Sequence, residues 1–381
     1  GISSAASDVY KRQVLGLKPS KAMFKNTSWE LNSEESPETK LVFNPLNRAF
    51  EMDAVAMTYK DQKISLRANA KDSLSTNIAL EFQNVDLAKV TPEIDSLSLG
   101  GTINGGLNVS KFKDTYLPKS MLDVEDFSVN SFNLGAFQAK IEGNSSLTNY
   151  DVQLKIQDDL KESFSAVGNL DVSGVHSNLD LNLNFKDFIL NPLNPFGGGV
   201  ITNIRGKVSG FSKISGRLEK PQINGELRLD SGGISIPYLN IDYAFDDKTG
   251  VKLEGQSFVF EAAKIKDTKF LSKGILNGKM NHVNLKNWSL DTTIDSDRLL
   301  VLNTSETEES LYYGTGFVSG NIDISGPVNQ LFIEANVITS KGTIFKIPLN
   351  DSEMITENSY VKFLSPEEKN QKAVDRAIKL D

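Results

Sequence analysis

Apolar and polar residues alternate with a period of two along most of this chain. In Leu179-Asp-Leu-Asn-Leu-Asn-Phe185, four apolar side chains fall on one face of an extended segment and three polar ones on the other. The pattern recurs at 152–156, 225–230 and 320–325, and residues typical of turns lie between such runs, at 105–106, 149–150, 197–199, 231–233 and 247–250. The chain is therefore predicted to be all-β, a long antiparallel meander with one apolar and one solvated face.

A repeat of 110 residues reinforces this prediction. The segment from Gly206 to Gly216 aligns without gaps with the segment from Gly316 to Gly326, and a fainter third copy begins at Gly101. We interpret the unit as several strands of one continuous, elongated sheet, in which the glycines mark turns, kinks or bulges. The alternative is a simple duplication within any β-rich protein.

Three segments are expected along the chain. Residues 3–13 look, on back-translation, like a sequencing-library adapter, so residues 1–13 are set aside. Residues 14–349 are expected to form the continuous repetitive sheet, at about 11 residues per strand and turn, hence about 30 strands. Residues 350–381 are a polar segment with two possible short helices, at 351–363 and 366–379, and the chain is expected to be an internal fragment that is truncated here.

Composition narrows the possible functions. The apolar content of 39% is below the ~45–50% typical of globular domains and suits a structure with much surface per residue. The formal net charge of −8 argues against nucleic acid as a partner, because nucleic acid requires a basic face. The chain contains no cysteine, which excludes disulfides, thiolate metal sites and a cysteine nucleophile.

Residues that could carry catalysis are sparse. The two histidines, His176 and His282, have no nearby cluster of metal-ligating residues, and each is expected on a surface strand or turn. The acidic pairs at 246–247 and 295–297 are expected to be solvated. No nucleophile elbow, phosphate-binding loop or dinucleotide fingerprint is present. We therefore expect no enzyme activity, no cofactor and no metal, although an enzyme with an unrecognised site is kept as a third and weaker reading.

The glycine-punctuated strands carry a family resemblance. Residues 216–229 (GRLEKPQINGELRL), 232–239 (GGISIPYL), 122–135 and 342–348 resemble the TamB family, within the broader AsmA-like group, and the resemblance covers most of residues 14–365. It implies a sheet curled like a taco around an apolar groove, with few short helices. It also implies a Gram-negative periplasmic protein, the subunit of the translocation and assembly module, anchored in the inner membrane through an N-terminal segment outside this chain.

The same resemblance implies a function and partners. The family is linked to phospholipid traffic and to outer-membrane protein assembly, so phospholipid is one expected partner. The other is an Omp85-type outer-membrane barrel (TamA/BamA-like), met through a C-terminal region expected to lie outside this chain. The alternative is a passive structural β-solenoid or adhesin-like surface protein whose apolar face is a sealed core. The residues expected to line a lipid groove are Val208, Ile214, Leu218, Ile223, Leu227, Leu229, Ile234, Val318, Ile322, Ile324, Val328, Ile333, Val337 and Ile344.

Overall fold

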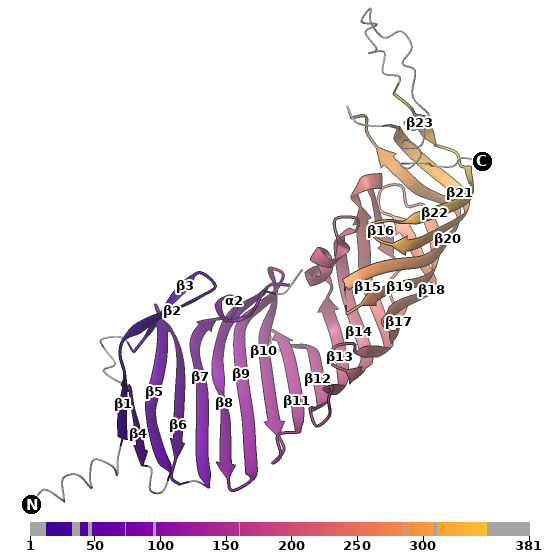
Figure 1. Ribbon diagram of the computed structural model, residues 1–381. Helices are drawn as coiled ribbons and strands as arrows, with labels where there is room; N and C mark the ends of the chain where they lie inside the picture. Colours follow the sequence, from indigo (N-terminus) through magenta and orange to yellow (C-terminus); the bar gives the residue numbers. More distant parts are fainter. Residues whose placement is uncertain are drawn as a thin grey trace, which may run out of the picture.

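A computed structural model describes residues 13–32, 39–44, 48–72, 74–93, 97–159, 161–284, 286–307 and 311–348 (Figure 1). Within them, 23 strands form one antiparallel sheet, accompanied by three short helical segments, so the predicted all-β fold is confirmed. The expected adapter segment, except Gln13, and the two helices expected beyond residue 350 lie outside the described residues.

The elements follow one another with few long connections. The first half contains β1 (Gln13–Leu17), β2 (Ser20–Phe24), β3 (Thr27–Leu31), β4 (Thr39–Asn44), β5 (Ala49–Tyr59), β6 (Gln62–Ala70), β7 (Ser75–Asp86), α2 (Leu87–Val90), β8 (Leu99–Phe112), β9 (Thr115–Val129), β10 (Phe132–Gly143), β11 (Asn149–Asp158), β12 (Lys161–Asp171) and β13 (Asn178–Ile189). The second half contains the 3₁₀ segment η1 (Asn191–Gly197), β14 (Thr202–Arg217), β15 (Gln222–Ile236), η2 (Pro237–Leu239), β16 (Ile241–Phe245), β17 (Thr249–Gly255), β18 (Ser257–Asp267), β19 (Lys273–Val283), β20 (Lys286–Thr304), β21 (Tyr313–Pro327), β22 (Phe332–Thr339) and β23 (Ile344–Lys346).

Neighbours in sequence are neighbours in the sheet almost throughout. From β4 to β15 each strand pairs with the next one, and the β2–β3 hairpin is attached through β5. The sequential order is interrupted at β15, which has two partners on the same side. Its first half pairs with β17 and its end pairs with β16, and β16 and β17 both pair with β18. The result is an elongated, curved trough with the strands lying across its length (Figure 1).

The repeated glycines explain the curl of the sheet. Gly105, Gly210 and Gly320 are equivalent in the repeat and all have positive φ, at 105°, 144° and 135°. In each copy the strand paired with that glycine has a bulge a residue or two further on: β7 after Phe82, β13 after Phe185 and β20 after Ser296. A Cβ on Gly105 would lie 2.2 Å from the backbone oxygen of Met121, so no other residue fits this backbone unchanged. Bulges bend strands and increase their twist, so a bulge in every copy curls the sheet.

These glycines also correct the expected strand count. Residues 105–106 and 231–233 were expected to be turns, but they lie inside β8 and β15. Bulges absorb them without ending the strand, so strands reach 19 residues in β20. The described residues therefore contain fewer and longer strands than the expected 30.

The two rims of the trough differ. One rim, here called the turn rim, consists of hairpin turns that hydrogen-bond to the next hairpin along the trough. For example, the N–H of Tyr116 donates to Ser145 O at 2.9 Å and that of Val172 to Thr148 O at 2.7 Å. The opposite rim, the loop rim, carries the β2–β3 hairpin, α2, η1 and η2 (Figure 1). In the part of the chain that the structure describes, the helical segments thus lie on one side of the trough.

Candidate functional site

A continuous apolar row runs along the inside of the trough. Successive cross-strand pairs link one residue from each of sixteen strands, from β5 to β21, and Ser212 is the one polar residue among them. The row is Met57, Ile64, Phe82, Gly105, Leu122, Ala139, Leu154, Ala166, Leu183, Ser212, Gly225, Leu253, Phe258, Met280, Leu290 and Gly326. At ~4.8 Å per strand the row is about 70 Å long. No charged side chain interrupts it.

The outer face has the opposite character. Lys213 pairs with Asp180 across β13 and β14 at 2.8 Å, Lys252 with Glu261 at 2.6 Å, and Lys279 with Glu254 at 3.2 Å. Lys207, Glu226 and Arg228 are exposed as well. Such exposed ion pairs contribute little stability, so their main effect is to keep this face solvated.

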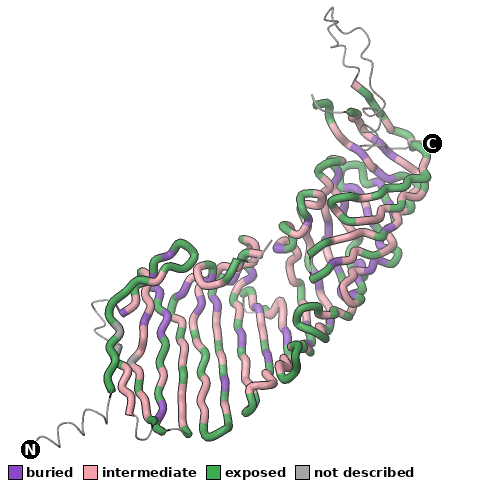
Figure 2. The backbone as a smooth tube through the Cα atoms, viewed as in Figure 1, coloured by how far each residue is buried: buried purple, intermediate pink, exposed green. Residues whose placement is uncertain are grey.

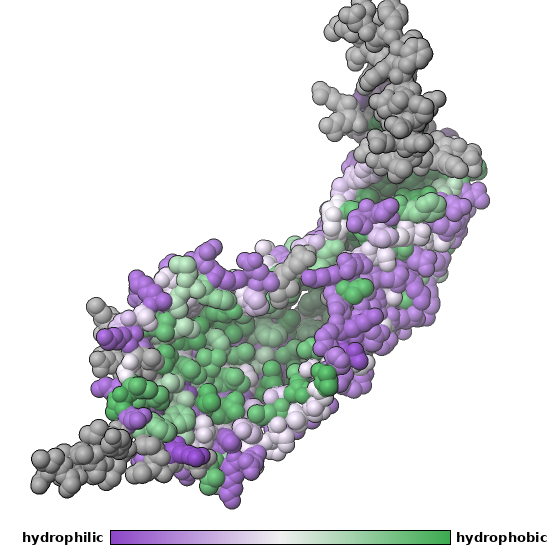
Figure 3. All heavy atoms as spheres, in the orientation of Figure 1, coloured by the Kyte–Doolittle hydropathy of each residue, from purple (hydrophilic) through white to green (hydrophobic). Residues whose placement is uncertain are grey.

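The trough is open over β5–β13, its open half. Inward-facing Leu66, Ile78 and Leu107 are 38%, 43% and 42% exposed. Leu66 and Ile78 lie between apolar neighbours on adjacent strands, whereas Leu107 lies between Leu80 and Ser120. Figure 3 shows the resulting apolar surface across the concave side of these strands. Two parts of this half are covered. Under the loop rim Trp29 of β3 and Leu87 of α2 pack on Val85 and Ile103, and across β11–β13 the inner side chains Val152, Ala166, Leu181 and Leu183 pack on one another.

The trough is closed over β14–β20, its closed half (Figure 2). Inward Val208, Leu229 and Val251 are 6%, 5% and 8% exposed, and they pack with Phe260 and Ala263. Nearer the loop rim a second cluster joins Ile241 and Tyr243 of β16, Ile265 of β18, Leu299 and Leu300 of β20 and Phe317 of β21. Here the inner face is filled by its own side chains.

Three phenylalanines lie where the two halves meet. The ring centroids of Phe164, Phe185 and Phe188 are 5.1–5.9 Å apart. Phe188 packs on the apolar clusters of both halves, and all three rings are only partly buried. Any apolar ligand moving from the open half into the closed half would have to pass this aromatic cluster.

Six of the fourteen predicted lining residues lie in the closed half, on β14 and β15, and six lie on β21–β23. Val208, Leu227 and Leu229 are buried on the inner face, and Ile214, Ile223 and Ile234 are partly buried beside them. Val318, Ile322, Ile324 and Val337 are partly buried on β21 and β22, whereas Ile333 and Ile344 are 57% and 59% exposed on the last strands.

Leu218 and Val328 lie elsewhere. They are equivalent in the repeat, and each is the first residue after its strand, because β14 ends at Arg217 and β21 at Pro327. Their N–H groups donate to Ser177 O and Trp288 O, which fastens their turns to the turn rim. They are therefore rim residues and not part of the inner face of a strand.

The open half contains lining residues that the sequence prediction omitted. Leu66, Ile78, Leu80, Phe82, Leu107 and Leu122 all face inward there. In the sequence, the alternation in Ile78-Ala-Leu-Glu-Phe82 and the faint third repeat copy indicate these inward positions. The two clearer copies of the repeat lie on β14 and β21 instead.

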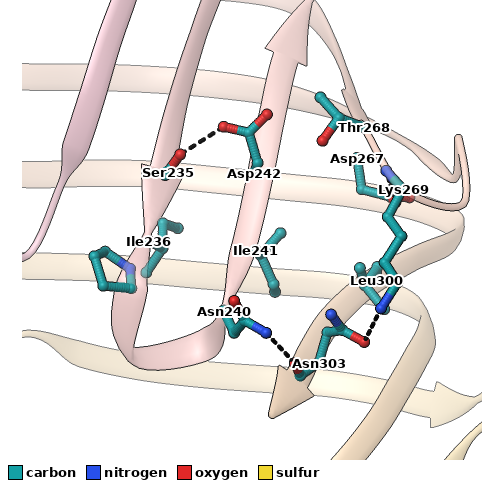
Figure 4. A pocket seen from close by; sticks show the side chains of 11 residues that line it. Ser235, Ile236, Asn240, Ile241, Asp242, Asp267, Thr268, Lys269, Leu300 and Asn303 are labelled. Atoms are coloured by element: carbon teal, nitrogen blue, oxygen red, sulfur yellow. Dashed lines mark hydrogen bonds between the residues drawn. The ribbon is translucent and has the colours of Figure 1, made fainter.

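Two features were checked for catalytic potential: the two histidines and a polar pocket at the loop rim. His176 lies exposed in a turn as expected, but the expectation for His282 is wrong. Its side chain is 6% exposed between the rings of Phe258 and Trp288, and burial lowers its pKa. A pocket of about 380 Å³ lies at the loop rim between η2, β16 and β20 (Figure 4).

The charged groups of that pocket are already occupied. Arg205 binds both carboxylate oxygens of Asp242 at 2.8 and 2.7 Å. Burial alone would raise the pKa of Asp242, but hydrogen bonds from Arg205, Ser235 and Thr268 together with the charge of Arg205 hold it below its usual value. Asp267 is fully buried and accepts bonds from the turn that follows it, including three backbone N–H groups. Within the described residues no group of three or more potential metal ligands occurs.

These features define an elongated β-sheet protein with an apolar trough, solvated outside and open along part of its length. Residues 20–229 match the family description "TamB, N-terminal domain", and residues 265–380 match "TamB C-terminal domain". The chain belongs to the TamB family. No curated protein and no solved structure matches it.

Family membership places the chain in a broad functional class. TamB proteins are envelope components for transport or assembly and are not a known enzyme family, which supports a role in lipid transport or outer-membrane assembly. The second match shows that sequence typical of the family's C-terminal domain is present in residues 265–380. Among the described helices, none has the length and apolarity needed to span a membrane.

Proposed function

We propose that this chain is part of a periplasmic bridge that conducts phospholipid acyl chains between the inner and outer membranes. The observation that supports it best is the row of apolar residues across sixteen strands, with exposed apolar side chains beside it in the open half. An acyl chain lying there would keep its head group in water at the open side. Transport of this kind needs continuity of apolar surface and no catalytic group.

The energetics suit loose, non-specific binding. Each methylene that moves from water onto an apolar surface gains about 0.8 kcal/mol. Exposed Leu66, Ile78 and Leu107 leave such a surface uncovered in the open half, and covering it would be favourable for the protein too. Because the contacts are with methyl and aromatic groups, sliding by one strand exchanges one set of contacts for an equivalent set.

The proposal extends to location and partners. The bridge is anchored in the inner membrane through an N-terminal segment, and it meets an Omp85-type barrel (TamA/BamA-like) at the outer membrane, where it supports outer-membrane protein assembly. The match to the family's C-terminal domain over 265–380 supports placing the barrel contact towards that end.

A second function is favoured by the closed half. Since Leu229, Val251 and Leu299 are 5%, 8% and 0% exposed, β14–β20 resemble the sealed core of a purely structural β-protein. Under this alternative the chain is a passive spacer, and the open half is covered by a protein partner instead of lipid.

Photo-crosslinking separates the two functions. A photoreactive amino acid replaces Leu107 in the open half, or outward-facing Met121 on the next strand as the matched control. After incubation with vesicles of phosphatidylethanolamine and phosphatidylglycerol, we expect a phospholipid adduct at position 107 and a much weaker one at 121. Equal adducts at both positions, or none at either, would contradict lipid conduction and favour the structural spacer.

A further inference from the structure

The polar pocket of Figure 4 lies at the loop rim, apart from the apolar row. Four segments supply its lining: the end of β15 with η2, the start of β16, the turn that follows β18 and the end of β20. Its volume of about 380 Å³ falls in the range of about 300–1,000 Å³ that is usual for small-molecule sites. Because these segments lie around it, the pocket suits a compact ligand better than an extended chain, which needs a groove that continues at both ends.

The charges of the pocket balance. Two carboxylates, those of Asp242 and Asp267, are offset by Lys269 and by Arg205, which binds Asp242. Neither carboxylate is available to a cation, because Asp242 is held by Arg205 and Ser235, and Asp267 accepts hydrogen bonds from backbone N–H groups of its own turn. The pocket therefore suits a neutral polar ligand and not a strongly charged one.

Two side-chain amides in the pocket each keep one unused hydrogen-bonding atom. Asn240 donates through its Nδ2 to Asn303 O at 2.6 Å, and its Oδ1 has no partner among the described residues. Asn303 accepts through its Oδ1 from Lys269 Nζ at 3.2 Å and from Thr315 Oγ1 at 3.4 Å, and its Nδ2 likewise has no partner in the described part of the chain. In Figure 4 both unused atoms lie on the side that faces Ile241, towards the middle of the lining residues. The pocket thus offers a ligand one acceptor and one donor close to each other.

A ligand that satisfies these atoms must both donate and accept hydrogen bonds. It donates to Asn240 Oδ1, and it accepts from Asn303 Nδ2 and from the remaining N–H groups of Lys269. A hydroxyl group does both, whereas an ionised carboxylate only accepts and an ammonium group only donates. The rest of the lining includes the apolar side chains of Ile236, Pro237 and Ile241. A sugar unit meets all of these demands, since its ring carries neighbouring hydroxyls at the edge and C–H groups on its faces.

We infer that this pocket is a binding site for one neutral sugar unit. One hydroxyl donates to Asn240 Oδ1, a neighbouring hydroxyl accepts from Asn303 Nδ2 and Lys269 Nζ, and a C–H face of the ring packs on Ile236 and Pro237. The affinity expected for a ligand of this size in an open pocket is on the order of millimolar. The site is separate from the apolar row, so this inference does not depend on lipid conduction.

Saturation-transfer difference NMR detects binding in this affinity range. The whole chain is mixed in turn with glucose, galactose and N-acetylglucosamine, and with glycerol and triglycine as probes of other chemistry. Asn303→Leu removes the unused amide donor, and Lys269→Met removes the charged donor while keeping the length of the side chain. Asn336→Leu on β22 is the matched control, because Asn336 is exposed and does not line the pocket. Thermal melting checks the fold of each variant, and exposed Lys269 supplies the test should Asn303→Leu impair folding.

At least one of the three sugars should receive saturation from the parent chain and from Asn336→Leu. The same signal should fall at least about fivefold in Asn303→Leu and in Lys269→Met, because each loses a hydrogen bond to the ligand. Absence of a signal from all three sugars would overturn the inference, as would a sugar signal that both pocket variants retain. Signals from glycerol or triglycine as strong as those of the sugars would show that the pocket does not select a sugar, which would overturn it too. The lipid adduct at position 107 tests the proposed function separately.

Discussion

The contrast between the two halves gives a sharp prediction about a charge on the inner face. Leu107→Arg places the charge in the open half, and Leu229→Arg places it in the closed half. Full burial of a leucine is worth about 1.5–3 kcal/mol. Since Leu107 is 42% exposed, its replacement should cost about 1–1.5 kcal/mol of unfolding free energy, because the arginine stem can lie on the apolar face while its head reaches water.

Leu229→Arg should behave differently. Leu229 is 5% exposed among Val208, Leu227 and Phe260, so the new charge has neither water nor a partner. Lost burial and an unpaired buried charge together cost at least about 5 kcal/mol, which is within the total stability of many domains. We therefore expect Leu229→Arg to unfold at least part of the sheet.

Thermal melting and lipid crosslinking together test this reasoning. The crosslinker occupies Ile141, which lies two strands from Leu107 in the same cross-strand row. Leu107→Arg should melt close to the parent chain and lose most of the lipid adduct, whereas Met121→Arg on the outer face should keep both properties. Melting of Leu107→Arg as low as that of Leu229→Arg would show that the open half is a sealed core, and an unchanged adduct would show that lipid does not use this row.

Three further predictions follow from single residues. Gly105→Ala should lower the free energy of unfolding by about 1–3 kcal/mol in urea titrations, because its positive φ and the backbone of β9 exclude a Cβ, and a neutral result would refute this account of the bulge. Burial lowers the pKa of His282, so the unfolded chain binds the proton more readily than the folded one, and the free energy of unfolding should fall as the pH drops below 6.5. His282→Phe should remove that fall, whereas the same change at exposed His176 should leave it in place. Asp242→Asn should lower the free energy of unfolding by about 1.5–3 kcal/mol at pH 7. This loss should shrink below pH 3.8, because the carboxylate bound to Arg205 stabilises the fold only while it is charged. A loss that does not change with pH would contradict this.

The alternation of residues predicted the faces of the strands well. Val208, Leu227 and Leu229 lie inside, and Glu226 and Arg228 lie outside, because a period of two within one unbroken strand leaves no other choice. The repeat likewise predicted a continuous sheet. Both signals are local, or recur at a fixed spacing, so they can be recognised in the sequence.

Other features depend on how the sheet curls. Leu218 and Leu229 carry similar sequence signals, yet one is 50% and the other 5% exposed, because one follows the end of β14 and the other packs with Val251 and Phe260. Glycines at 105–106 resemble a turn until their cross-strand partners are known. His282 is buried because the rings of Phe258 and Trp288, 24 and 6 residues away in the chain, close over it. The closed half is a product of long-range contacts that no short window of sequence contains.

The direction of the strands has a mechanical consequence. In an antiparallel ladder the hydrogen bonds run perpendicular to the strands, and here the strands lie across the trough, so these bonds point along its length. Tension between the two ends would therefore load a few bonds at a time and peel strands apart one after another, instead of shearing whole ladders. The backbone ties between neighbouring turns, such as Val172 to Thr148 on the turn rim and Asn130 to Ser98 on the loop rim, would resist this peeling at both rims.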